Sequence, residues 1–109
     1  MTYTDVERLI LDLTNDDSYA LSEVVSWVHQ VLPHQSSADT KTLVRTAVEN
    51  LVNRGRLIAL WMERPDGPEE VLDPERTRTK LGDDLAWLSY KHWRPHIRIA
   101  AAPDVSGRE

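Results

Sequence analysis

The chain has 109 residues, of which 40% are hydrophobic and 28% charged, and its formal net charge is −5. This length and composition predict one globular domain with a single modest core and exclude a disordered chain. No run approaches the roughly 18 apolar residues of a membrane helix, the N-terminal residues lack a signal-peptide pattern, and the absence of cysteine excludes disulfides and thiol chemistry. We therefore expect a cytoplasmic protein with one domain over residues 1–100 and a loose tail at 101–109.

The charge is distributed unevenly along the chain. Residues 1–39 carry seven acidic side chains and one basic one, and residues 65–74 carry four acidic side chains and no basic one. Two blocks, residues 40–64 and residues 75–98, each carry an excess of three positive charges. A protein that binds nucleic acid through uniform positive charge would not have this distribution.

The first segment predicts an amphipathic helix. Thr4 and Glu7 form a capping-box pattern, and apolar residues then recur at helical spacing as far as Leu13. We expect this helix to end near Asn15.

A second helix is predicted after a short extended piece at residues 20–21. Ser22 is a good N-cap residue, and the residues from 24 to 32 place valine and leucine on one helical face. Pro33 ends the helix, because the residue before a proline is pushed out of the α region.

The third helix has the most regular apolar pattern in the chain. Asp39 or a nearby serine caps it, and apolar residues from Leu43 to Val52 repeat at positions i, i+1, i+4, i+5, i+8 and i+9. Gly55 follows at the position where a left-handed residue usually ends a helix.

A β-hairpin is predicted next. Residues 56–62 are short, apolar and bounded by turn signals, which predicts a strand. Residues 64–68 contain proline and glycine in a turn pattern, and residues 69–72 return as a second strand.

The segment after the hairpin predicts further helix. Asp73 is an N-cap residue and Pro74 takes the first helical position. Gly82 interrupts the apolar pattern that follows, so residues 75–93 are either one kinked helix or a turn followed by a helix. Residues 97–99 alternate apolar and polar side chains, which suits a short edge strand.

This order of elements resembles the winged helix-turn-helix superfamily. The residues that carry the resemblance are 51–58, Leu-Val-Asn-Arg-Gly-Arg-Leu-Ile, in which an apolar pair, a basic residue and a glycine lead directly into the first strand of the wing. The resemblance covers residues 4–72 and implies a mainly helical α+β fold with three helices and a β-hairpin wing. The C-terminal helical segment lies outside it.

The resemblance also implies DNA as the partner, because the third helix of this superfamily can enter the major groove. Polar residues off the apolar face of this helix are expected to be exposed, and Arg64 is the one basic residue close to the wing tip. The candidate contacts to phosphates and bases are Thr40, Lys41, Thr42, Arg45, Thr46, Glu49, Asn53 and Arg64. An ordinary solvated helix face explains the same residues.

The charge of the wing favours a different partner. Its tip carries Asp66, Glu69 and Glu70, and the phosphate backbone of DNA would repel these carboxylates. An acidic surface instead attracts basic proteins. The alternative is therefore a protein-binding module, such as an adaptor or an immunity-type protein that masks a basic partner.

An aromatic cluster with one arginine lies after the wing. Trp87, Tyr90, Trp93 and Arg94 are of the residue types enriched at interface hot spots. They could contact a partner or a second copy in a homodimer, or they could pack the last helix against the first three. Both interpretations stay open at this point.

No motif predicts an enzyme or a cofactor. His92 and His96 have the spacing of two metal ligands on a helix, but Pro95 between them would distort that helix. Adjacent aspartates at 16–17 and 83–84 are typical of helix caps. No phosphate-binding loop or nucleophile motif is present. The sequence thus predicts a non-enzymatic DNA-binding transcriptional regulator first, and a protein-binding module as the alternative.

Overall fold

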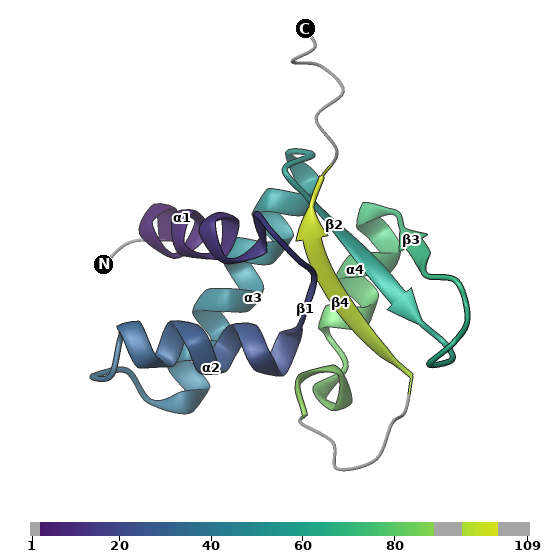
Figure 1. Ribbon diagram of the computed structural model, residues 1–109. Helices are drawn as coiled ribbons and strands as arrows, with labels where there is room; N and C mark the ends of the chain where they lie inside the picture. The colour runs from purple at the N-terminus through teal and green to yellow at the C-terminus, as the bar shows by residue number, and fades with distance from the viewer. Residues whose placement is uncertain (1–2, 89–94, 103–109) are drawn as a thin grey trace, which may run out of the picture.

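The computed structural model describes residues 3–88 and 95–102, and it is an α+β fold with four α-helices and a four-stranded antiparallel sheet (Figure 1). The elements in chain order are α1 (Tyr3–Thr14), β1 (Tyr19–Ala20), α2 (Leu21–Val31), α3 (Ser37–Asn53), β2 (Leu57–Met62), β3 (Glu70–Leu72), α4 (Pro74–Leu81), the 3₁₀ turn η1 (Asp84–Trp87) and β4 (His96–Ala101). None of the helices in the described part of the chain is both long enough and apolar enough to cross a membrane.

The sheet has the strand order β1-β4-β2-β3. The predicted hairpin of β2 and β3 is confirmed, with Leu60 opposite Val71. The strand predicted around Ile97 and Ile99 is confirmed, but its predicted place at the edge of the sheet is wrong, because β4 pairs with β1 on one side and with β2 on the other. Ile99 lies opposite both Tyr19 and Ala59. The last strand of the described residues therefore lies in the centre of the sheet. In the chain, β3, α4 and η1 separate it from its neighbour β2. It also extends to Ala101, within the predicted tail.

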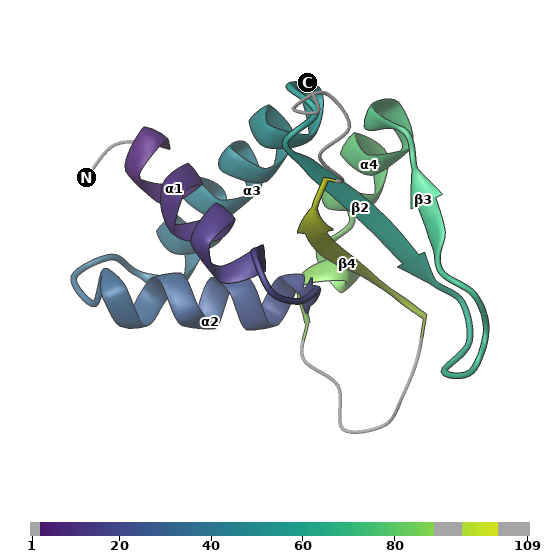
Figure 2. The same cartoon turned by 45° about the horizontal axis from the view of Figure 1, so that its top comes forward.

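The helices lie on one face of the sheet, so the fold has two layers (Figures 1 and 2). Alternate residues of the strands point toward the helices and are buried, among them Leu57, Ala59, Ile97 and Ile99. They join the apolar faces of α1, α2 and α3 in one core. A single hydrophobic core is what a domain of this size can support.

Two helices begin earlier than their sequence signals predict. The chain is already helical at Tyr3, so the predicted cap at Thr4 is wrong. Helix α2 begins at Leu21, with Ala20 and not Ser22 at the N-cap position. The Ala20 N–H donates to the Glu23 carboxylate at 2.8 Å. The Glu23 side chain in the first turn of α2 therefore satisfies the backbone N–H of the N-cap residue, although Ala20 itself has no side chain that could cap the helix.

Arg98 fixes β4 against the start of α2. Its guanidinium donates to the hydroxyl of Ser18 at 3.0 Å and to the Ser18 carbonyl oxygen at 2.6 Å. The Glu23 carboxylate lies 3.9 Å from the same side chain. One arginine therefore ties the last strand to the segment before the second helix.

The boundaries of α3 follow the predicted chemistry. The Ser36 hydroxyl accepts a hydrogen bond from the Asp39 N–H at 3.0 Å, so the nearby serine is the cap. At the other end Gly55 has φ +75°, and the Gly55 and Arg56 N–H groups donate to the carbonyls of Val52 and Leu51. This pair of bonds is a Schellman motif, which turns the chain directly from α3 into β2.

The segment after the hairpin contains two short elements within its described part. Asp73 caps α4 by accepting a hydrogen bond from the Arg76 N–H at 2.7 Å, and α4 gives way at Gly82 to the turn η1. The break at Gly82 excludes a single continuous helix through residues 75–88. Trp87 of η1 is buried, and its indole N–H donates to the Leu81 carbonyl at 2.9 Å.

We expect Gly55→Ala to destabilise the protein by about 1–2 kcal/mol, because a left-handed conformation is unfavourable for residues with a Cβ. Added volume is not the cause, because nothing lies within 4 Å of a Cβ built at this position. Gly82→Ala is the control, because Gly82 has φ −78° and its Cβ would meet neighbours at ordinary contact distances. This variant should match the wild type or exceed it by less than about 1 kcal/mol. Urea unfolding of both variants measures the difference, and equal losses would contradict the assignment.

Candidate functional site

A hollow lies between the outer side of α3 and the turn η1. It brings together most of the residues that the sequence predicts to bind DNA. Its lining consists of Ala38, Lys41, Thr42, Arg45, Thr46, Glu49 and Asp84. Helix α3 contributes all of these residues except Asp84.

Both cations of this hollow contact carboxylates. Lys41 Nζ lies 3.4 Å from Asp84 Oδ1, and Arg45 Nε lies 3.3 Å from Glu49 Oε2. Two cations and two carboxylates give the lining a formal charge of zero. These pairs are partly exposed, and such pairs contribute at most about 1 kcal/mol each. They nevertheless remove the excess of positive charge on which phosphate binding depends.

The prediction that Thr40 is exposed is wrong. Its side chain is buried and its hydroxyl donates to the Ser36 carbonyl at 3.0 Å. His29 Nδ1 lies 3.3 Å from the same hydroxyl oxygen. Because the hydroxyl hydrogen is directed to Ser36, the Nδ1–H of His29 is the donor in this contact. Thr40 therefore joins α2 to α3 on the inside of the fold, while Thr42 and Asn53 are exposed as predicted.

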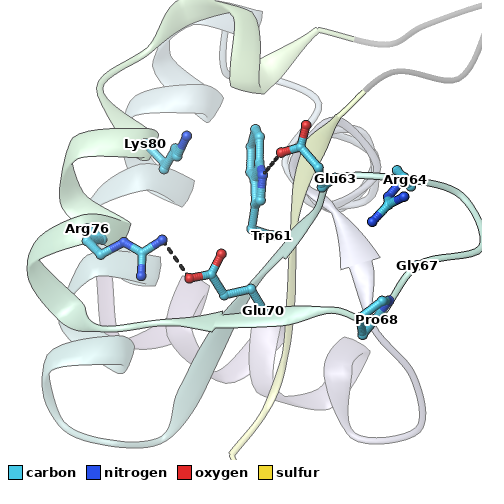
Figure 3. A pocket seen from close by; sticks show the side chains of 8 residues that line it. All are labelled: Trp61, Glu63, Arg64, Gly67, Pro68, Glu70, Arg76 and Lys80. Carbon is cyan, nitrogen blue, oxygen red and sulfur yellow. Dashed lines mark hydrogen bonds and ion pairs between the residues drawn. The ribbon is translucent and has the colours of Figure 1, made fainter.

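A second hollow lies between the β2–β3 hairpin and α4 (Figure 3). It brings Arg64, a predicted DNA contact, together with two residues of the second basic block. The lining residues are Trp61, Glu63, Arg64, Gly67, Pro68, Glu70, Arg76 and Lys80. We call this site the hairpin hollow.

Trp61 stands in the middle of the hairpin hollow. Its indole N–H donates to Glu63 Oε1 at 2.7 Å, and Lys80 Nζ lies 3.9 Å from the centroid of the ring. Arg76 Nη2 lies 2.8 Å from Glu70 Oε2. Figure 3 places Lys80 and Arg76 on one side of the ring, and Glu63 and Arg64 on the other. The site thus combines an aromatic surface with charges of both signs.

The two basic blocks of the sequence therefore enter two different sites. Lys41 and Arg45 lie in the hollow along α3, whereas Arg76 and Lys80 lie in the hairpin hollow. Each of these sites also contains two carboxylates. The pattern of charge along the chain indicated the blocks but could not indicate the carboxylates that fold against them.

The residues predicted to contact a protein partner have different outcomes. Asp66, Glu69 and Glu70 are exposed on the hairpin. Trp87 is buried in the core, so its packing interpretation is confirmed and its interface interpretation is wrong. The remaining members of the cluster, Tyr90, Trp93 and Arg94, lie outside the described residues, as does His92. The homodimer contact predicted through this segment stays a prediction.

The sequence reasoning did not identify the hairpin hollow as a site. Trp61 belongs to the apolar run that predicts the strand, and it packs against the core while it also lines the hollow. The sequence feature that could have indicated this site is the spacing of Arg76 and Lys80, which are four residues apart and therefore share one side of a helix. Which residues face that side of the helix, however, depends on how α4 packs on the hairpin.

Within residues 3–88 and 95–102, no group of three or more His, Asp or Glu side chains is placed to hold a metal ion. Asp17 accepts a hydrogen bond from the neighbouring Ser18 N–H at 2.7 Å, and Asp84 contacts Lys41.

Comparison of the chain with protein-family models, with curated proteins and with solved structures gave no match. The function is therefore argued from the geometry of the two hollows and of the hairpin.

We expect Thr40→Val to destabilise the protein by about 1 kcal/mol, because the substitution keeps the shape of the side chain but leaves the His29 Nδ1–H without its partner. The Ser36 carbonyl loses one of its two hydrogen bonds and keeps the one from the Thr40 N–H at 2.9 Å. Thr42→Val is the matched control. The Thr42 hydroxyl also bonds a carbonyl four residues earlier, at 3.1 Å, but the site is exposed and water can replace it. Its unfolding free energy should change by less than about 0.5 kcal/mol. Similar losses in both variants would show that burial of Thr40 is not the cause.

Proposed function

We propose that the chain is a non-enzymatic module that binds a basic protein through its β2–β3 hairpin. One observation carries this proposal. The charged residues of the hairpin segment 63–70 are four carboxylates and one arginine, and all of them are exposed. Figure 2 shows the loop of this hairpin extending beyond the end of the sheet, away from α1, α2 and α3. A basic partner can therefore reach these carboxylates without contacting α1, α2 or α3.

Electrostatics supports a protein partner over DNA at this surface. Complementary charge accelerates encounter and selects among partners. The phosphate backbone, which supplies much of the affinity for DNA, would meet the carboxylates of Asp66 and Glu69. The cations of α3 do not compensate for this repulsion, because Lys41 and Arg45 already contact Asp84 and Glu49.

A winged-helix DNA-binding regulator is the second candidate. It is favoured by the course of the chain at Gly55, where α3 leads through a Schellman motif directly into β2. This is the part of the chain on which the resemblance to winged helices rests. It is also favoured by the shared direction of Lys41, Thr42, Arg45 and Thr46, which line one hollow. Exposed ion pairs are weak, so a phosphate could replace the carboxylates that contact Lys41 and Arg45.

Charge reversal on the hairpin tests the first proposal. The immobilised wild-type chain should retain a basic protein from a lysate of its own source at low salt, and the Asp66→Lys/Glu69→Lys variant should lose it. The control is Asp12→Lys/Asp16→Lys, which makes the same change in net charge at exposed positions on and after α1. The control should retain the protein, with at most a few-fold weaker binding. The proposal is wrong if none of the three forms retains a basic protein, or if the hairpin variant retains as much as the wild type.

A titration of mixed-sequence duplex DNA at low salt tests the second candidate. Because the α3 hollow has no excess of positive charge, we expect no salt-sensitive binding at micromolar protein concentration. Fluorescence anisotropy of labelled DNA provides the measurement. Binding that weakens with salt and is lost in Lys41→Glu/Arg45→Glu would instead establish the DNA-binding function.

A further inference from the structure

The hairpin hollow lies at the base of the same acidic hairpin, and its chemistry indicates what part of a partner enters it. We infer that it receives an arginine side chain of the basic partner, with the guanidinium bound by Glu63 beside the ring of Trp61. This inference rests on the proposed function, because it assigns a specific contact to the same partner. Three features of the hollow support it.

The first feature is a carboxylate that is already held in place. The indole N–H of Trp61 donates to Glu63 Oε1 at 2.7 Å. An ionised carboxylate accepts about four hydrogen bonds through its two oxygens, so Glu63 retains most of its capacity. Its side chain is also exposed. A guanidinium can therefore bind Glu63 without first ordering it, which lowers the entropy lost on binding.

The second feature is the aromatic surface. Lys80 Nζ lies 3.9 Å from the centroid of the Trp61 ring, so one face of this ring already binds a cation. Figure 3 shows Lys80 on one side of the ring, whereas Glu63, Arg64 and Pro68 border the other side. Indole is the best aromatic partner for a cation. A guanidinium is flat, stacks on aromatic rings and binds carboxylates with two parallel bonds, which an ammonium does not.

The third feature is the size of the hollow. Its volume is about 330 Å³, at the lower end of the roughly 300–1,000 Å³ typical of small-ligand pockets. A hollow of this size suits one long side chain. Gly67 and Pro68 of the hairpin turn form its wall opposite α4.

The charges around the hollow favour a cation once the hairpin is counted as a whole. Arg76 is neutralised by Glu70 at 2.8 Å. The remaining charges are Lys80 and Arg64 against Glu63, and the hairpin tip adds Asp66 and Glu69. The sum over the hairpin and these two residues of α4 is −1. An anion would in addition compete with Glu63 and Glu70 for the cations that line the hollow.

The experiment follows the indole N–H signal of Trp61 by NMR in the full chain. Trp61→Phe identifies this signal among those of the four tryptophans. N-acetyl-arginine amide is titrated into the wild type, and N-acetyl-lysine amide and inorganic phosphate serve as comparison probes. The arginine probe should shift the Trp61 signal with millimolar affinity, as expected for one side chain. The lysine probe should bind several-fold more weakly, and phosphate should leave the signal unchanged.

Two conservative variants identify the carboxylate. Glu63→Gln should weaken the arginine probe at least fivefold. Glu69→Gln, with the same charge change on the same hairpin, should stay within twofold of the wild type. Both positions are exposed, so loss of folding is not expected, and the other NMR signals verify this. Equal effects of the two variants, or a shift with phosphate but not with arginine, would overturn the inference.

The outcomes of the two experiments can be told apart. If hairpin charge reversal abolishes retention of the basic protein but the arginine probe leaves Trp61 unshifted, the partner stands and the arginine site is wrong. If the arginine probe binds at Trp61 through Glu63 but retention does not depend on the hairpin, the arginine site stands and the proposed partner is wrong.

Discussion

The pairing of β4 between β1 and β2 is the constraint on which the rest of the structure depends. It places Ile97 and Ile99 against the helices and joins β1 to the hairpin strands in one sheet. Arg98 secures the pairing through Ser18, a residue 80 positions away in the sequence. Because β2 and β4 are direct neighbours in the sheet, the described residues between them in the chain form an excursion from β2. The hairpin loop, α4 and the hollow between them all belong to that excursion.

Charge compensation separates the two candidate functions. Lys41, Arg45 and Arg54, three of the cations in the first basic block, contact Asp84, Glu49 and Glu7. Asp84 and Glu7 come from other parts of the chain, whereas Glu49 lies one helical turn from Arg45 in α3, and together they make the basic block a surface of mixed charge. The hairpin is different, because only one of its four carboxylates, that of Glu70, has an arginine partner within salt-bridge distance among the described residues. Most of the negative charge of the hairpin therefore remains available to a partner.

Sequence patterns predicted those helix ends that depend on residues close together in the chain. The glycine at 55 and the aspartate and proline at 73–74 specified helix ends because backbone geometry and capping act within a few residues. Sequence patterns did not predict the central position of β4, since strand pairing over long separations leaves no local pattern. The candidate site divides in the same way. The polar face of α3 was predictable from helical periodicity, but the burial of Thr40 and the cation on Trp61 depend on which elements pack together.

The place of β4 in the sheet also determines when the molecule can become complete. A strand that is both the last described element and a central member of the sheet must reach its neighbours from the far end of the chain. During synthesis α1, α2, α3 and the hairpin emerge before β4 does. Until then β1 and β2 lack the strand with which both of them pair. Contacts of such high sequence separation slow folding. The nascent chain therefore exposes one edge of β1 and one edge of β2 until β4 leaves the ribosome, and unpaired strand edges of this kind can pair with other chains.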